Sequence, residues 1–150
     1  MTKTNRMQAV YDQIAEGFAT VNADMPPELI IAAGQFLSLI KPGALILDLG
    51  CGAGRDMAWF ESQGVSAVGS DLSAGMLAQA RLRARGSLVQ ADMRHLPFQR
   101  GCFQGVWCCA ALLHLPKADA PRALAEVHRV LDPGGPLFLS VHEGMGEGWE

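Results

Sequence analysis

The chain has 150 residues, of which 49% are hydrophobic and 18% charged, and its formal net charge is −3. These values are typical of one compact domain and argue against a disordered chain. The acidic balance disfavours nucleic acid as a partner, and the longest apolar run, Val106 to Leu113, is too short to cross a bilayer. Because the first 18 residues also lack the apolar core of a signal peptide, we expect one cytoplasmic domain over residues 1–150.

The first half of the chain contains two strand-like apolar runs, each followed by a helix-like segment. A helix is expected between residues 24 and 40, since Pro26-Pro27 favours a helix start and Lys41-Pro42-Gly43 ends the apolar body. The first strand-to-helix unit has a strand over Ala44 to Leu49, a glycine-rich turn over Gly50 to Gly54, and a helix over Arg55 to Gln63 capped by Gly64. The second unit has a strand over Val65 to Gly69 that leads into Asp71, and a helix over Ala74 to Arg85 capped by Ser73.

The second half continues the same alternation. The expected elements are short strands over Ser87 to Ala91 and Phe103 to Ala110, a helix over Ala118 to Leu131, a turn over Asp132 to Gly135, and a strand over Pro136 to Val141. Strands alternating with helices predict the α/β class, with five parallel strands in a doubly wound sheet. In the common order 3-2-1-4-5, ligands bind at the carboxyl ends of the strands where the winding reverses.

The four cysteines form no C-x-x-C pair and have no clustered histidines beside them, so we expect no metal site. Cysteines next to buried strands usually act as small hydrophobic residues, and reduced thiols fit a cytosolic protein. Arg81, Arg83 and Arg85 precede Gly86, where the helix is expected to stop. We interpret them as cations at the negative end of the helix dipole rather than as a nucleic-acid site.

The glycine-rich turn, Asp48-Leu49-Gly50-Cys51-Gly52-Ala53-Gly54, lies between an expected strand and an expected helix. Glycines permit positive φ angles and close approach of a ligand, and the helix start favours an anionic group such as a pyrophosphate or a carboxylate. The dinucleotide fingerprint G-x-G-x-x-G would require glycine at position 55, which is arginine. A tight strand-to-helix connection remains the simpler interpretation of the turn taken alone.

Two acids follow the next two strands. Asp71 comes 21 positions after Gly50, where a carboxylate is placed to accept hydrogen bonds from a ribose diol, although a lone acid there is more often a helix cap or turn residue. Asp92 ends the third strand, where it is placed to accept from an adenine amino group, or simply to form the bend before His95-Leu96-Pro97. The combination with the glycine turn favours a nucleoside site.

With these residues the chain resembles the class I S-adenosylmethionine-dependent methyltransferases, a Rossmann-like family, and in particular their small-molecule branch. The resemblance extends from Tyr11 to about His142 and rests on four segments in order: Leu47 to Gly54, Gly69 to Ser73, Gln90 to Met93, and Leu131 to Gly135. It implies S-adenosyl-L-methionine as cofactor, S-adenosyl-L-homocysteine as product, and a small-molecule methyl acceptor. The order and spacing of all four segments are specific, whereas any one alone is not.

The resemblance also implies residue roles. Gly50 and Gly52 would line the methionine part, with Asp48 orienting the loop and the amino group, and Asp71 would hold the ribose. Leu72, Asp92 and Met93 would surround the adenine, Ala110 would border the sulfonium, and Tyr11 would close over the cofactor unless it is an ordinary aromatic of an amphipathic helix. The full set of expected cofactor-binding residues is Tyr11, Asp48, Gly50, Cys51, Gly52, Gly54, Arg55, Asp71, Leu72, Asp92, Met93, Ala110 and Leu115.

His114, just past the fourth strand, is the candidate general base because its unperturbed pKa suits proton transfer near neutral pH. The competing interpretation is a loop histidine packed beside Leu115-Pro116, since no orienting partner is visible in the sequence. His95 is a weaker candidate, and His128 is expected on a solvated helix face.

Two other functions stay open: a methyltransferase-like module that binds cofactor or a partner without turnover, and an NAD(P)-dependent oxidoreductase. The resemblance also implies two further strands after the fifth, but here only Gly144 to Glu150 follow. An unpaired apolar edge strand favours association. We therefore expect either a C-terminally truncated domain or a homodimer in which a second copy covers the fifth strand.

Overall fold

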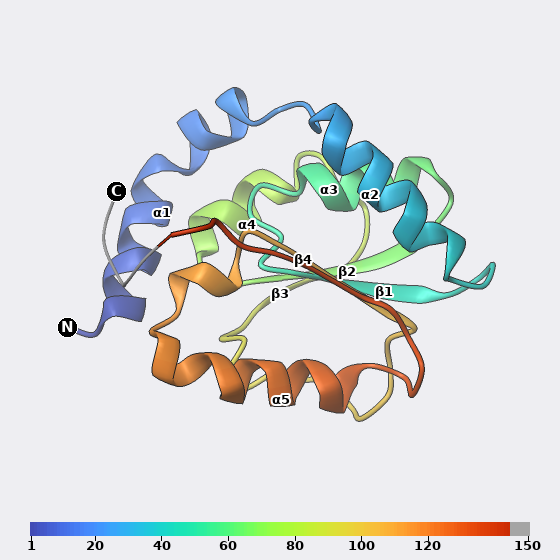
Figure 1. Ribbon diagram of the computed structural model, residues 1–150. Coiled ribbons are helices and arrows are strands. Elements are labelled where there is room, and N and C mark those ends of the chain that lie inside the picture. The colour runs from blue at the N-terminus through green and yellow to red at the C-terminus, as the bar shows by residue number, and fades with distance from the viewer. Residues whose placement is uncertain (145–150) are drawn as a thin grey trace.

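The computed structural model describes residues 1–144 and contains one sheet of five parallel strands in the order β3-β2-β1-β4-β5 (Figure 1). All four neighbouring pairs are parallel, which confirms the doubly wound arrangement. The strands are β1 (Leu45–Leu49), β2 (Ser66–Asp71), β3 (Leu88–Gln90), β4 (Gly105–Cys109) and β5 (Leu137–Ser140).

Helices cover both faces of this sheet (Figure 1). They are α1 (Lys3–Val21), α2 (Pro27–Ser38), α3 (Arg55–Ser62), α4 (Ala74–Ala80) and α5 (Ala120–Val130), with short 3-10 turns η1 (Leu112–His114) and η2 (Lys117–Asp119). Figure 1 shows α5 on one face, with α2 and α3 on the other. Helix α1 packs against α4 and the start of α3 through a small cluster that contains Ala15, Ala19, Ala53 and Met76.

The central strand β1 is buried on both faces because its apolar side chains alternate between two cores. Leu47 packs with Val106 and with Val130 of α5, whereas Ile46 packs with Trp107 and with Phe60 of α3. All six of these side chains are fully buried. A strand covered on both faces reads as a continuous apolar run, and this explains why β1 tolerates only one polar residue, Asp48.

Most predicted boundaries are confirmed to within a few residues, but α4 is shorter than expected. It ends at Ala80 rather than Arg85, so the interpretation of Arg83 and Arg85 as last-turn cations of this helix is wrong. Instead, the Arg83 guanidinium donates to the backbone carbonyl of Ala19, in the last turn of α1. The predicted cap at Ser73 is confirmed, since its hydroxyl accepts from the backbone N–H of Met76.

Strand β5 lies at the edge of the sheet and leaves Leu137, Leu139 and Val141 exposed. The expected cover by a second copy therefore stays a prediction, and the tail over residues 145–150 lies outside the described residues. Among the helices of residues 1–144, none has the length and apolarity needed to cross a membrane.

Candidate functional site

A cavity of about 370 Å³ opens at the carboxyl ends of the strands. Its walls come from five places: helix α1, the turn between β1 and α3, the end of β2, the residues after β3, and the loops after β4 and β5. This is the edge at which the predicted site residues were expected to meet. The volume lies within the usual range of small-molecule sites.

The glycine turn forms the floor of the cavity and needs glycine for two reasons. Gly50, Gly52 and Gly54 all have positive φ angles, of 71°, 53° and 83°. A Cβ on Gly50 would lie 2.3 Å from the Cβ of Ala111, so no side chain fits there without displacing the loop after β4. The backbone N–H of Gly50 donates to the carbonyl of Ser70 over 2.7 Å, which holds the turn against the end of β2.

Asp71 connects the end of β2 to the glycine turn. One carboxylate oxygen accepts from the backbone N–H of Gly52 and the other from that of Ser73, each over 2.9 Å. Burial raises the pKa of the Asp71 carboxyl, whereas the hydrogen bonds from Ser73 and Gly52 oppose this rise. Asp71 therefore stabilises the turn and also lines the cavity. Each of its oxygens can still accept a further hydrogen bond from a ligand hydroxyl.

Asp48 is the most unusual acid of the site. It is only 2% exposed, and its Oδ2 has no hydrogen-bond partner, although the side chain lines the cavity. Burial, together with the neighbouring carboxylates of Asp56 and Asp71, raises its pKa well above the usual value. A buried acceptor without a partner is costly, so this oxygen favours a ligand that brings a hydrogen-bond donor or a positive charge.

Asp56, in the first turn of α3, was not anticipated as a site residue. Its carboxylate accepts from Arg55 Nε over 2.6 Å and from Trp107 Nε1 over 2.9 Å. These bonds anchor the start of α3 to β4 and neutralise Arg55, which lines the cavity beside it. The only sequence signal for this role is its place two residues after the last glycine of the turn.

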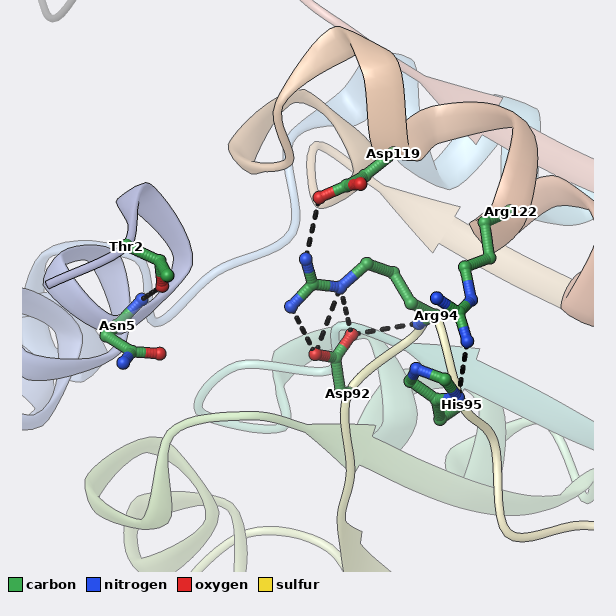
Figure 2. A network of polar contacts seen from close by, with 7 residues as sticks. All are labelled: Thr2, Asn5, Asp92, Arg94, His95, Asp119 and Arg122. Carbon is green, nitrogen blue, oxygen red and sulfur yellow. Dashed lines mark hydrogen bonds and ion pairs between the residues drawn. The ribbon is translucent and has the colours of Figure 1, made fainter.

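Asp92 lines the cavity as expected, but its carboxylate already has a strong partner. Figure 2 shows the Arg94 guanidinium lying between Asp92 and Asp119, with N–O distances of 2.6 Å to each. Arg94 Nε also donates to both oxygens of Asp92, and this pairing lowers the pKa of the Asp92 carboxyl. The proposed contact from Asp92 to an adenine amino group must therefore share these oxygens with Arg94.

His114 has the orienting partner that the sequence did not reveal. The Tyr11 hydroxyl lies 2.8 Å from His114 Nε2, and the two ring centroids are 5.1 Å apart in an edge-on arrangement. Burial lowers the pKa of His114, and nearby His142 and Lys3 lower it further. Burial and the charge of Asp71 raise the pKa of Tyr11. At neutral pH the pair is therefore a neutral imidazole and a neutral phenol.

The cavity brings together almost the whole predicted set. Every predicted site residue lines it except Gly54, which instead begins α3 and packs so closely on Ala80 that an added Cβ would lie 3.0 Å from that residue. Sequence reasoning missed several lining residues, including Thr4, Gln8 and His142. No local motif marks these residues, since they reach the cavity only through the packing of α1 and the end of β5.

Cys51 and Cys108 are buried, whereas Cys102 and Cys109 are partly exposed. Cys51 lines the cavity, and burial raises its pKa well above the usual value, as burial raises the pKa of Cys108 to about 12. Thiols with such values are poor nucleophiles. Within residues 1–144, no group of histidine, cysteine and acidic side chains is arranged to hold a metal ion.

The sheet is doubly wound, and an acid-lined cavity lies where its winding reverses. These features place the chain in the class of α/β domains that hold a ligand over a glycine-rich strand-to-helix turn. Residues 46–135 match the family model described as a methyltransferase domain, and the chain belongs to that family.

Similar proteins differ widely in the acceptors that their names state. The chain is 31% identical to the malonyl-[acyl-carrier protein] O-methyltransferase of Pectobacterium atrosepticum, covering 100% of this chain and 61% of that protein. It is 35% identical to a probable tRNA methyltransferase 9B of Homo sapiens, covering 88% of this chain and 28% of that protein. Overall, the chain spans about half the length of the curated relatives it matches.

Among solved structures, the fold is similar to the phosphoethanolamine N-methyltransferase 2 of Haemonchus contortus in complex with S-adenosyl-L-methionine. The TM-score is 0.59 and the sequence identity 28%, over 69% of this chain and 27% of that one.

Proposed function

We propose that this chain binds S-adenosyl-L-methionine and transfers its methyl group to a small molecule, leaving S-adenosyl-L-homocysteine. The observation that carries the proposal is the unpartnered, buried carboxylate oxygen of Asp48 beside the glycine turn. This cofactor carries an ammonium group and a sulfonium group, and both charges suit a cavity wall lined by acids. Family membership and a similar structure with the same cofactor support the assignment.

The described residues fit the parts of such a cofactor. The backbone of Gly50 and Gly52 leaves room for the methionine part, since neither position carries a side chain and Asp48 lies directly before the turn. Asp71 would accept hydrogen bonds from the ribose hydroxyls, because each of its oxygens is used by only one backbone donor. Leu72 and Met93 line the same wall and would pack against the adenine ring.

The bound cofactor supplies a methyl group on a cationic sulfur, which is electrophilic without further activation. The chain's residues therefore have three tasks: to align the acceptor, to exclude water and to take up a proton. Helix α1 contributes Tyr11 to the cavity lining, and the loop after β4 contributes Leu115, which is buried. His114 is neutral and oriented by Tyr11, which are the properties of a general base.

A calorimetric titration with S-adenosyl-L-homocysteine, with NADH in parallel, tests this proposal. Saturation to 100 times the Kd stabilises a folded protein by about 2.7 kcal/mol, so thermal unfolding provides a second readout. We expect binding and stabilisation by S-adenosyl-L-homocysteine alone. Binding of NADH alone would identify an oxidoreductase instead.

Turnover needs its own measurement, because a binding module would pass the first test. Release of S-adenosyl-L-homocysteine is followed with trial acceptors, and an Asp71→Ala variant serves as the matched control. Binding with no transfer to any acceptor would identify the non-catalytic module as the correct function.

A further inference from the structure

The cavity is divided by charge. All of the carboxylates that line it belong to the wall formed by β1, α3, β2 and the residue after β3; within residues 1–144 these are Asp48, Asp56, Asp71 and Asp92. This wall faces the cofactor in the proposed function, and its negative charge matches the positive charges of that ligand.

The opposite wall is formed by α1 and by the loops after β4 and β5. It contributes Thr4, Gln8, Tyr11, His114 and His142, and no acidic side chain from these segments lines the cavity within the described residues. Asp12, which follows Tyr11 in α1, contacts the start of α4 instead. Its Oδ1 accepts from the Ser73 hydroxyl over 2.5 Å and from the Gly75 N–H over 2.9 Å.

The Thr4 hydroxyl provides an independent sign that a ligand belongs at this wall. Thr4 is only 6% exposed and lines the cavity, yet its Oγ1 has no hydrogen-bond partner. Like Asp48 on the other wall, Thr4 has a buried polar atom without a hydrogen-bond partner, in a residue that lines the cavity. The hydroxyl donates and accepts, so it suits an oxygen-bearing group.

The charged groups near His114 also favour a ligand that is not cationic. A positive charge on Lys3 of α1 or on His142 after β5 disfavours a second positive charge on the imidazole. An ammonium group placed beside His114 would meet the same repulsion, whereas an anionic oxygen would be attracted.

We propose that the methyl acceptor is a small oxygen acid, either a phenol, an enol or a carboxylic acid, whose oxygen is received between His114, His142 and the Thr4 hydroxyl. This inference rests on the proposed function and names the class of its substrate. Tyr11 is a positioning residue in this arrangement, because it acts through His114 rather than on the acceptor.

The test uses the full chain saturated with S-adenosyl-L-homocysteine and three probes that share one ring: phenol, benzoate and benzylamine. Binding is followed by the imidazole resonances of His114 and His142 in NMR spectra. We expect phenol and benzoate to shift these resonances and benzylamine to bind at least about tenfold more weakly, as charge repulsion at a half-buried site requires. Equal or tighter binding of benzylamine would overturn the inference, as would the failure of both oxygen acids to bind at millimolar concentration.

Two variants test whether phenol and benzoate bind at the proposed position. His142→Glu places a negative charge at the exposed rim and is expected to abolish benzoate binding, and Thr4→Val is expected to weaken phenol binding severalfold. Glu143→Gln, on the next exposed residue, is the matched control and is expected to change neither. The variants should bind S-adenosyl-L-homocysteine as the unaltered chain does, so loss of that ligand would count against the proposed function and not against the acceptor class. Benzoate binding that survives His142→Glu would refute the inference.

Discussion

The two walls of the cavity are built in different ways. The cofactor-facing wall is built mainly from two short segments, residues 48–56 and 70–73, with Asp92 and Met93 beside them. Within the two segments, backbone N–H groups donate to the Asp71 carboxylate and to the Ser70 carbonyl. The acceptor-facing wall joins α1 to loops about a hundred residues later, and the hydrogen bond between Tyr11 and His114 links these two parts. The first wall is therefore specified by local sequence, whereas the second depends on tertiary packing.

The walls also differ in the electrostatic cost of burying their polar side chains. Asp48 and Asp71 are held in positions where burial raises their pKa, which a cationic ligand relieves. On the other wall, no acidic side chain lines the cavity within the described residues, and His142 is exposed. Changes to the first wall should therefore have large effects on ligand binding, and changes to the second should have smaller ones.

The largest effect is expected for Asp71→Ala. This change removes the acceptor for the N–H groups of Gly52 and Ser73 as well as the proposed ribose contact. Hydrogen bonds to a charged group contribute about 1.5–3 kcal/mol each, so the affinity for S-adenosyl-L-homocysteine should fall at least about 100-fold in a calorimetric titration. Asp24→Ala, on an exposed residue between α1 and α2, is the control and should leave the affinity unchanged.

Gly50→Ala should be next in size, because it combines backbone strain with a clash. Both Gly50 and Gly64 have positive φ angles, but only at Gly50 does an added Cβ meet another atom, 2.3 Å away on Ala111. We expect Gly50→Ala to lower the free energy of unfolding by about 3 kcal/mol and Gly64→Ala by about 1 kcal/mol. Chemical denaturation measures both, and equal losses would show that the close contact with Ala111 is unimportant.

Asp48→Asn should raise stability while it weakens binding. The raised pKa of Asp48 means that folding loses stability as the pH rises above the usual range of an aspartate, because the unfolded chain ionises more readily. A neutral amide removes this loss, so we expect the unliganded protein to gain roughly 1–3 kcal/mol at pH 7.

Asp56→Asn is the matched comparison, since both oxygens of Asp56 have partners in Arg55 and Trp107. It should destabilise the protein under the same conditions. A loss of stability in both variants, measured by thermal unfolding, would contradict the interpretation of Asp48 as a strained, ligand-poised acid.

On the acceptor-facing wall, Tyr11→Phe removes only the hydroxyl that lies 2.8 Å from His114 Nε2. A neutral hydrogen bond contributes about 1 kcal/mol, so we expect a change of that size in stability and only a severalfold loss in affinity for S-adenosyl-L-homocysteine. The imidazole resonances of His114 should report a changed tautomer balance. A loss of affinity as large as that of Asp71→Ala would show that the two walls are not independent.

The smallest effect is expected in the pH dependence of stability. Because the pKa of His114 is lowered in the folded state, its contribution is fully present above about pH 6.5 and is lost as the pH falls through the folded-state pKa. His114→Asn should reduce this decline in pH-dependent unfolding curves, whereas His128→Asn on the exposed face of α5 should not. Identical curves for the two variants would contradict the assigned burial of His114.

The sequence predicted the sheet order and the cofactor-facing wall because both follow from local patterns. Apolar runs, the glycine turn and an acid after each of the next two strands are readable within short windows, and their positions were confirmed. The hydrogen-bond partners of Asp92 and His114 could not be predicted from the sequence. A long arginine side chain such as that of Arg94 can reach many positions, and Tyr11 lies 103 residues from His114. The length of α4 was overestimated because Arg81 to Arg85 have good helix propensity but leave the helix to contact other elements.

The proposed function requires one nucleoside to lie over the glycine turn with its ribose held by Asp71. A crystal structure of the chain with S-adenosyl-L-homocysteine tests this directly. We expect both ribose hydroxyls within hydrogen-bond distance of the Asp71 carboxylate and the amino group of the ligand beside Asp48. A nucleoside bound elsewhere, with Asp71 still contacting only Gly52 and Ser73, would contradict the account.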